Sequence, residues 1–496
     1  MELTLEKIAL RYEKDNHNRS SKAPLSLYLQ LFNLLRDMIV KRDLPENYAL
    51  PPSRQLAIRL GVSRSTIIRA YEFLRLEGFV ESKQGSGHSI KPLQKKVVSQ
   101  PLGTDSNYPE ISKLGKSFLN NASLINTTDD KSVAFRPGLP PLDIFPVAQW
   151  KNLSNLYWKN IKLSNLSYSP ASGIDQLKIN IANYLTLSRG IKCEANQVLI
   201  MSGSLQSLYL IGSALINPGD SVAMENPTFP NVHSIFRGLM GQVHGIGLDK
   251  EGMSLDRLEN LNVKPKIIHT TPSCHYPTGV QMTLKRRLEL LAFANKNESI
   301  IIENDYEHEL NNWDNPIPSL FSLDNQYRTI YLGTFNRLLH PSLRIGYMIV
   351  PRYLRDVTDA ILKHSHRFVP TSIQVVLNQF MEKKYLYAHI KNVVDVTKKR
   401  QHFFTQMFEE LFKDSEFRLQ SSSVLSLQNL ITVPKDSVDK DWVNLLGRHN
   451  IIVHSYNKCF TDSIGEQGLI LGYSSIPTAI IKNKLNQMNQ IMRKGK

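Results

Sequence analysis

Apolar residues in the first 90 positions recur at helical spacing and then give way to a strand–turn–strand pattern. A first helix over residues 25–40 is predicted because one of its faces is apolar, with Tyr28, Phe32, Leu35 and Ile39. Ser53 and Ser63 each precede a further helical segment, where a serine hydroxyl can accept from the free N–H groups of the first turn. Gly61 lies between these segments and suits the left-handed conformation that ends many helices. The pattern predicts a helix-turn-helix.

A hairpin is predicted directly after the third helix, which we expect to end at Gly78. Residues 79–82 and 88–90 have the character of short strands, and the glycine-rich segment 84–87 separates them. Together with the three helices, this hairpin predicts a winged helix-turn-helix.

Beyond residue 131, short apolar runs rich in β-branched residues alternate with longer helical stretches. The runs are residues 198–201, 221–224, 266–270, 299–302, 329–332 and 345–350. They are continuously apolar, as in strands buried on both faces of a parallel sheet. Alternation of such strands with helices predicts a large α/β domain with a mainly parallel sheet.

The length of 496 residues, 41% of them apolar, is too great for one typical domain. Residues 93–131 are polar and without periodicity, so we expect a linker there with one short helix. The predicted organisation is a winged helix-turn-helix domain over 1–92, the linker over 93–131 and an α/β domain over 132–496.

The formal net charge of +16 favours a polyanionic partner, most simply nucleic acid. Seventeen of the first 100 residues are Lys or Arg and ten are Asp or Glu, so basic residues are concentrated near the helix-turn-helix. The N-terminal residues are too charged for a signal peptide, and no apolar run is long enough to span a membrane. The three cysteines lie far apart, which favours neither disulfides nor a zinc site. We therefore expect a cytoplasmic protein.

On the third helix, Arg64, Ser65 and Arg69 lie away from the apolar face. Recognition helices place residues near their N-terminus against base edges, and arginines at helix starts bind phosphates. A solvated basic face on a packing module is the alternative, and the agreement of helix order, caps, wing and charge argues against it. The expected DNA-binding residues are Arg54, Ser63, Arg64, Ser65, Thr66, Arg69, Gly85, Ser86 and Gly87.

Residues 24–90 closely resemble the winged helix-turn-helix of GntR-type bacterial repressors. The resemblance is carried by residues 50–57 (LPPSRQLA), 60–66 (LGVSRST), 70–79 (AYEFLRLEGF) and 82–87 (SKQGSG). It implies binding to double-stranded DNA.

Residues 132–496 resemble fold type I aminotransferases, through short motifs that occur in family order. They are residues 168–173 (YSPASG), 202–206 (SGSLQ), 225–230 (ENPTFP), 271–279 (TPSCHYPTG), 302–306 (IENDY), 333–335 (GTF) and 341–347 (PSLRIGY). The order of a GntR-type DNA-binding domain, a linker and an aminotransferase-like domain resembles that of the MocR/GabR regulators. The resemblance implies a smaller C-terminal α/β part, a homodimer and a pocket for pyridoxal phosphate.

The resemblance implies roles for the matched residues. Ser202, Gly203 and Ser204 open a helix whose N–H groups can bind a phosphate, together with Arg344. Phe229 matches the ring that stacks on the pyridine, and Tyr306 the tyrosine at the cofactor's phenolic oxygen. Each of these residues alone is as well explained by ordinary packing. The expected cofactor-like pocket comprises Ser202, Gly203, Ser204, Phe229, Asn304, Tyr306, Arg337 and Arg344.

The sequence differs from the aminotransferase family at the residues that attach the cofactor and bind the substrate. Arg337 stands at the position of the Schiff-base lysine, and there is no lysine between Lys296 and Lys363. An imine needs a neutral amine, whereas a guanidinium stays protonated and delocalised. Asn304 stands where a carboxylate pairs with the pyridinium nitrogen, and the adjacent Asp305 should point elsewhere because side chains alternate along a strand. The two arginines that hold substrate carboxylates in GabR-like members align with Asn231 and Ser475.

These observations predict a sequence-specific DNA-binding transcription regulator, not an enzyme. Its large domain is expected to dimerise and to bind an effector, with pyridoxal phosphate held noncovalently if it binds. A working aminotransferase with an accessory DNA-binding module is the alternative, and it needs a lysine that the sequence does not supply. A third hypothesis makes the large domain a ligand-free dimerisation scaffold, which the sequence does not distinguish from the first.

Overall fold

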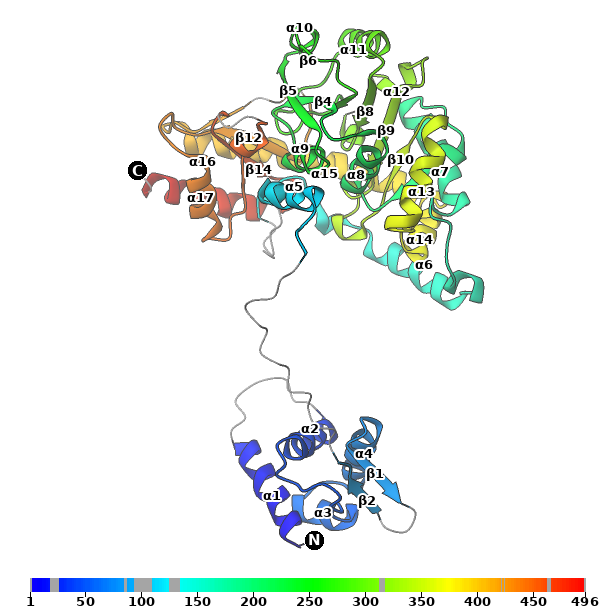
Figure 1. The fold of residues 1–496 in the computed structure, drawn as a ribbon. Coiled ribbons are helices and arrows are strands. Elements are labelled where there is room, and N and C mark those ends of the chain that lie inside the picture. Colours follow the sequence, from blue (N-terminus) through cyan, green and yellow to red (C-terminus); the bar gives the residue numbers. More distant parts are fainter. Residues whose placement is uncertain are drawn as a thin grey trace. The chain divides into compact units, whose positions relative to one another are not determined.

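The computed structural model describes residues 2–17, 26–83, 87–92, 109–124, 134–311, 317–420, 422, 424–461 and 465–494. The chain divides into two compact units, Met1–Pro109 and Glu110–Lys496 (Figure 1). Each unit has its own hydrophobic core and is described by itself.

The N-terminal unit is a winged helix-turn-helix, as predicted. Its elements are α1 (Glu2–His17), α2 (Leu27–Val40), α3 (Ser53–Leu60), α4 (Arg64–Leu76), β1 (Val80–Lys83) and β2 (Gly87–Ile90). The two strands pair antiparallel, and Gly61 has the left-handed φ of +64° that the turn after α3 requires. The predicted apolar face of α4 is buried, with Ile67, Tyr71 and Leu74 each at most 2% exposed.

Two details of this unit differ from the sequence-based expectation. Helix α1 was not predicted, and it packs through the buried Ile8 while Glu6 and Glu13 form ion pairs with Arg59 of α3. The expected cap at Ser53 is wrong: Pro52 holds the N-cap position, and Ser53 is the first helical residue. The Ser63 cap of α4 is confirmed, since its Oγ accepts from the Thr66 N–H at 3.2 Å.

In the described part of the large unit, an eight-stranded sheet has the order β3-β10-β9-β8-β7-β4-β5-β6. Strands β9, β8, β7, β4 and β5 are parallel, whereas β10 runs antiparallel to both of its neighbours. All six predicted apolar runs are strands of this sheet, which confirms the mainly parallel α/β fold. The strands are β3 (Val198–Met201), β4 (Ser221–Asn226), β5 (Gln242–Asp249), β6 (Gly252–Met253), β7 (Ile267–Thr270), β8 (Ile300–Asn304), β9 (Thr329–Thr334) and β10 (Gly346–Ile349).

Helices cover both faces of this sheet because successive strand residues point to opposite sides. Ile200 and Ile349 pack with α7, α14 and α15, while Leu199 and Met348 pack with α8, α9 and α13 (Figure 1). The helices that follow the linker region are α6 (Val147–Lys159), α7 (Asp175–Arg189), α8 (Ser204–Leu215), α9 (Pro230–Gly238), α10 (Leu255–Glu259), α11 (Leu284–Asn297), α12 (Leu320–Leu323), α13 (Arg352–Ser365), α14 (Thr371–Glu382) and α15 (Tyr385–Phe412).

A small antiparallel sheet forms the predicted C-terminal α/β part. Its order is β11-β12-β14-β13, and the long helix α15 packs against it through Phe404 and Phe408. The elements are β11 (Arg418–Leu419), β12 (Gln428–Thr432), α16 (Asp439–Gly447), β13 (His454–Ser455), β14 (Gly468–Gly472) and α17 (Thr478–Lys494).

The expected linker contains one described helix, α5 (Lys113–Asn121), which packs on α9 (Figure 1). The Ser117 hydroxyl donates to the Arg237 carbonyl at 2.8 Å, and the Phe118 ring lies against Gly238. A Cβ at position 238 would lie 2.4 Å from that ring, so the glycine permits the close approach. No helix within the described ranges is both long and apolar enough to cross a membrane.

The separate cores predict separate unfolding of the two units. Leu74 is fully buried in the N-terminal core, so Leu74→Ala should lower the unfolding free energy of that unit by about 2–5 kcal/mol. All four tryptophans lie beyond residue 109, so tryptophan fluorescence reports on the large unit alone. In a urea titration, hydrogen exchange of peptides from residues 27–90 should shift to lower urea while the fluorescence transition stays in place. The exposed Leu76→Ala should shift neither, and a common shift of both signals would contradict two independent cores.

Candidate functional site

The first turn of α4 presents a cluster of hydroxyl and guanidinium groups. Ser63 Oγ lies 2.8 Å from both Ser65 Oγ and Thr66 Oγ1, and Arg64 Nε donates to Ser53 Oγ at 3.3 Å. The Arg64 contact therefore brings the first turns of α3 and α4 together. Because the first N–H groups of a helix attract anions, two adjacent helix starts suit a phosphate backbone.

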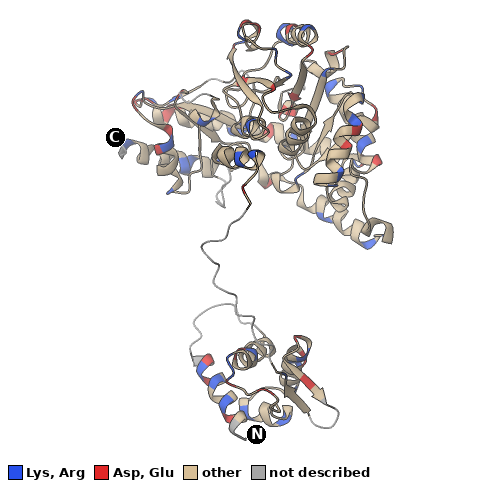
Figure 2. Ribbon diagram, in the orientation of Figure 1, with Lys and Arg blue, Asp and Glu red and all other residues tan. Residues whose placement is uncertain are grey.

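The other predicted DNA-contact residues are distributed around these helix starts. Arg54 is exposed on the first turn of α3, and Gly87 opens β2 with a φ of +81°. Arg69 is exposed but its guanidinium lies over the Tyr28 ring of α2, 4.3 Å from the centroid. Gly85 and Ser86 lie outside the described residues. In Figure 2, the Lys and Arg positions of this unit are distributed along its helices.

The large unit has a cavity of about 340 Å³ at the carboxyl ends of its parallel strands, where α/β folds commonly bind ligands. Seven of the eight predicted pocket residues line it. They are Gly203, Ser204, Phe229, Asn304, Tyr306, Arg337 and Arg344. The described lining residues include two arginines and no carboxylate or lysine.

The eighth residue, Ser202, does not line the cavity, because its N–H and hydroxyl both donate to Gln206 Oε1. That contact closes the turn after β3. Gly203 follows with a φ of +139°, and α8 then begins at Ser204, so the first residues of α8 line the cavity. Arg344 lines the same cavity and is exposed, with a left-handed φ of +51°. This end of the cavity has the donors for an anion.

Arg337, at the expected lysine position, forms an ion pair with a buried carboxylate. Its Nη1 lies 3.7 Å from Glu307 Oε1, and its guanidinium lies 5.3 Å from the centroid of the Tyr306 ring. Burial raises the pKa of Glu307, and the Arg337 charge opposes that shift. Gly138 leaves room for the guanidinium, because a Cβ there would lie 1.6 Å from Arg337 Nη1. Arg337 Nη1 and Glu307 Oε1 make no hydrogen bond within the described residues, so no hydrogen bond strengthens this ion pair.

The aromatic residues of the cavity hold one another in place. The Tyr306 hydroxyl donates to the Cys274 carbonyl at 3.0 Å, and burial keeps the pKa of Tyr306 well above its ordinary value. Phe229 packs edge-to-face on Tyr276, with ring centroids 5.0 Å apart. Tyr276 lines the cavity too and was not among the predicted site residues.

Asn304 and Asp305 point to different places, as strand alternation predicts. Asn304 Nδ2 lies 3.4 Å from Nε2 of the buried His269. Asp305 is buried beneath the sheet end, 2.8 Å from Arg189 and 2.8 Å from the Tyr331 hydroxyl. The cavity therefore has an amide, and no anion, at the carboxyl end of β8.

Sequence reasoning missed other members of the cavity. Gly138 and His454 come from segments far from the recognised motifs, and Glu307 pairs with Arg337 from behind the lining. Asn231 lines the cavity, whereas Ser475 is buried outside its lining. The signal for Glu307 was its position directly after the 302–306 motif.

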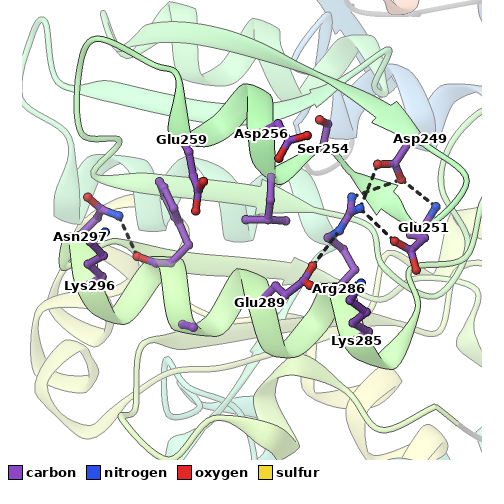
Figure 3. A pocket seen from close by; sticks show the side chains of 13 residues that line it. Asp249, Glu251, Ser254, Asp256, Glu259, Lys285, Arg286, Glu289, Lys296 and Asn297 are labelled. Atoms are coloured by element: carbon purple, nitrogen blue, oxygen red, sulfur yellow. Dashed lines mark hydrogen bonds and ion pairs between the residues drawn. The ribbon is translucent and has the colours of Figure 1, made fainter.

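A second cavity, of about 700 Å³, lies between α10 and α11 on the far edge of the sheet. Figure 3 shows Arg286 of α11 pointing toward Asp249 and Glu251 of the β5–β6 hairpin, with Glu289 beside it. Arg286 is buried, and it also donates to the Met253 carbonyl. These contacts attach the hairpin to α11.

Family models match the two units separately. The model described as "Bacterial regulatory proteins, gntR family" matches residues 27–90, and that of "Aminotransferase class I and II" matches residues 143–465. The chain belongs to the class I and II aminotransferase family and carries a GntR-family domain before it. This confirms the resemblance inferred from the motifs.

Individual relatives show how far each likeness extends. The chain is 28% identical to the "Probable rhizopine catabolism regulatory protein MocR" of Rhizobium meliloti, over 94% of each chain. It is 31% identical to "Aromatic-amino-acid aminotransferase 1" of Thermococcus litoralis, over 65% of this chain and 79% of that protein. The crystal structure of an archaeal alanine:glyoxylate aminotransferase matches 78% of this chain and 96% of its own, with a TM-score of 0.69 at 23% identity, which shows the fold.

The buried His269 predicts acid sensitivity of the large unit. Burial lowers the pKa of His269 from 6.5 to about 3, so the folded protein holds it neutral. Its contribution to stability is complete above pH 6.5 and is lost as the pH falls below that value, because only the unfolded state then binds the proton. Between pH 7 and pH 5 the loss should be about 2 kcal/mol.

The measurement is urea unfolding by tryptophan fluorescence at both pH values. His269→Gln should lose about 2 kcal/mol less than the wild type between pH 7 and pH 5. The exposed His366→Gln should lose as much as the wild type. Equal losses in all three proteins would show that His269 does not carry this linkage.

Proposed function

We propose that this protein is a sequence-specific DNA-binding transcription regulator whose aminotransferase-like domain senses an anionic ligand. The proposal rests on the match to MocR, which extends over 94% of each chain. A match of this length includes the winged helix-turn-helix as well as the large domain. Enzyme relatives such as the Thermococcus aminotransferase match 65% of this chain. We also propose a cytoplasmic location and the domain division 1–92, 93–131 and 132–496.

The cavity suits an anion held noncovalently. The first turn of α8 and Arg344 supply donors for a phosphate, and Phe229 and Tyr276 supply aromatic surface for a ring. Pyridoxal phosphate would thus be held by these residues, and it would supply an aldehyde for which the described lining offers no amine. The residues therefore fit the phosphate and the ring of the cofactor but not its covalent attachment.

Transaminase activity is disfavoured on three separate grounds. Arg337 offers no neutral amine, Asn304 offers no anion for a pyridinium nitrogen, and Asn231 and Ser475 stand in place of substrate-binding arginines. Because cofactor attachment, charge stabilisation and substrate binding are all weakened, we propose that the pocket does not catalyse transamination. The aminotransferase with an accessory DNA-binding module remains the competing function.

We further propose that the large domain forms a homodimer. An apolar stretch on and after α6 supports this, because its side chains are unusually exposed for their size. It comprises Trp158, Leu163, Leu166 and Tyr168. A two-fold protein also suits paired DNA half-sites.

The DNA-binding function predicts that residues 1–92 are necessary for binding to genomic fragments flanking the gene. Arg64→Ala should weaken specific binding by about 1–3 kcal/mol if Arg64 reads a base edge. Arg54→Ala should instead reduce the slope of log affinity against log salt by about one unit, as loss of one phosphate contact does. Gel shifts over a salt series measure both effects.

Arg75→Ala is the matched control, since Arg75 is exposed at the opposite end of α4. It should leave specific binding nearly unchanged. Specific binding that survives removal of residues 1–92 would refute the assignment of the DNA-binding unit.

The pocket predicts that pyridoxal phosphate does not attach covalently and that transamination is absent. After incubation with excess pyridoxal phosphate and borohydride reduction, the intact mass of the cavity peptides should not increase. Amino-acid-dependent keto acid formation should stay at the level of the buffer. A mass increase on a lysine that reaches the cavity would show that another residue has taken over attachment.

The reverse substitution tests whether the pocket is otherwise intact. Arg337→Lys combined with Asn304→Asp restores an amine and a carboxylate, so a visible absorbance band and a retained mass should appear. Arg337→Lys alone is the control for the contribution of Asn304. If the double variant shows no band, the cavity has diverged beyond these positions and the ligand-free scaffold is favoured.

The dimer predicts a clear result in sedimentation of the full chain. At micromolar concentration the wild type should sediment as a dimer, and Leu163→Arg should shift it toward the monomer, because a charge in a buried interface is costly. The control is Leu187→Arg, at an exposed leucine on α7. A wild type that sediments only as a monomer would overturn the proposal.

A further inference from the structure

Helix α4 exposes an isoleucine, Ile68, on the unit that is proposed to bind DNA. Ile68 is 39% exposed, whereas its neighbours Ile67 and Ala70 are fully buried in the core. Ile68 therefore does not complete the packing of the unit. The exposed part of the Ile68 side chain is therefore available for contact with an apolar group of a partner.

The position of Ile68 on α4 places it beside the predicted base-reading residues. Successive helix residues are rotated by about 100° around the axis. Ile68 therefore lies one turn after Arg64, and in a view along the axis it points between Arg64 and Ser65. The next residue, Arg69, is turned further around the helix, and its guanidinium lies over Tyr28. The side chain one turn along from Arg64 on this face is thus an isoleucine.

We propose that Ile68 contacts the 5-methyl group of a thymine in the major groove and so contributes to operator specificity. The inference rests on the proposed DNA-contact surface. Thymine alone among the four bases presents a methyl group in the major groove, and apolar side chains recognise it by contact. An isoleucine cannot satisfy the amino group that cytosine presents there, so the same contact selects against C·G pairs.

The test uses one genomic fragment from the flanking region, amplified either with dTTP or with dUTP. Uracil pairs as thymine does but lacks the methyl group. The wild type should bind the uracil fragment about fourfold more weakly for each thymine contact, the value for removal of one buried methyl group. Ile68→Ala should bind the thymine fragment more weakly than the wild type does, and should bind both fragments equally.

Leu76→Ala is the matched control, since Leu76 is also exposed but lies at the other end of α4. It should discriminate between the fragments as the wild type does. Each protein is judged by its own ratio of two affinities, so a loss of folded protein in one variant cancels.

The outcomes separate this inference from the function on which it rests. Equal wild-type affinity for both fragments overturns the methyl contact while DNA binding stands. Discrimination that persists in Ile68→Ala assigns the methyl contact to another residue, which also overturns the inference. Failure of the wild type to bind either fragment refutes the proposed DNA-binding function itself.

Discussion

The large domain holds the Arg337 guanidinium beside the buried Glu307 carboxylate, in a loose ion pair with an Nη1–Oε1 distance of 3.7 Å. Glu307 is almost fully buried, and its second oxygen accepts from the Ser426 hydroxyl and the Leu427 N–H. Arg337 supplies a cation beside this buried carboxylate, and the resemblance to aminotransferases implies that it stands at the position of the lysine that attaches the cofactor. The Arg337 guanidinium thus balances the charge of the carboxylate, and because it stays protonated it is not a nucleophile. The described lining of the cavity thus includes donors for an anion and no lysine.

The cavity is also connected, through α9, to α5 of the expected linker. The first turn of α9 lines the cavity through Asn231, and α5, the described helix of the linker, packs on α9 at Arg237 and Gly238. A ligand that alters the position of α9 would thus act on α5. Sensing requires a difference in contacts between two states, and the packing of α5 on α9 is one contact that such a difference would change.

Periodicity and local motifs predicted those features of the structure that depend on neighbouring residues. The apolar runs became strands because burial on both faces demands continuous hydrophobicity, as in 198–201. Strand alternation correctly separated Asn304 from Asp305. The features that were missed depend on contacts between distant segments. Helix α1 is held by Arg59, some fifty positions away, and the space for Arg337 depends on Gly138. Pro52 displaced Ser53 from the cap because the proline already fixes the entry to α3.

The most direct measurement of the central claim is the affinity for a flanking genomic fragment as pyridoxal phosphate is added and then removed by dialysis. If the cavity senses an anion noncovalently, the dissociation constant changes with saturation and returns to its starting value after dialysis. Arg344→Ala should require more ligand for the same change. An affinity that does not respond at any ligand concentration, or a response that survives dialysis, would contradict the account.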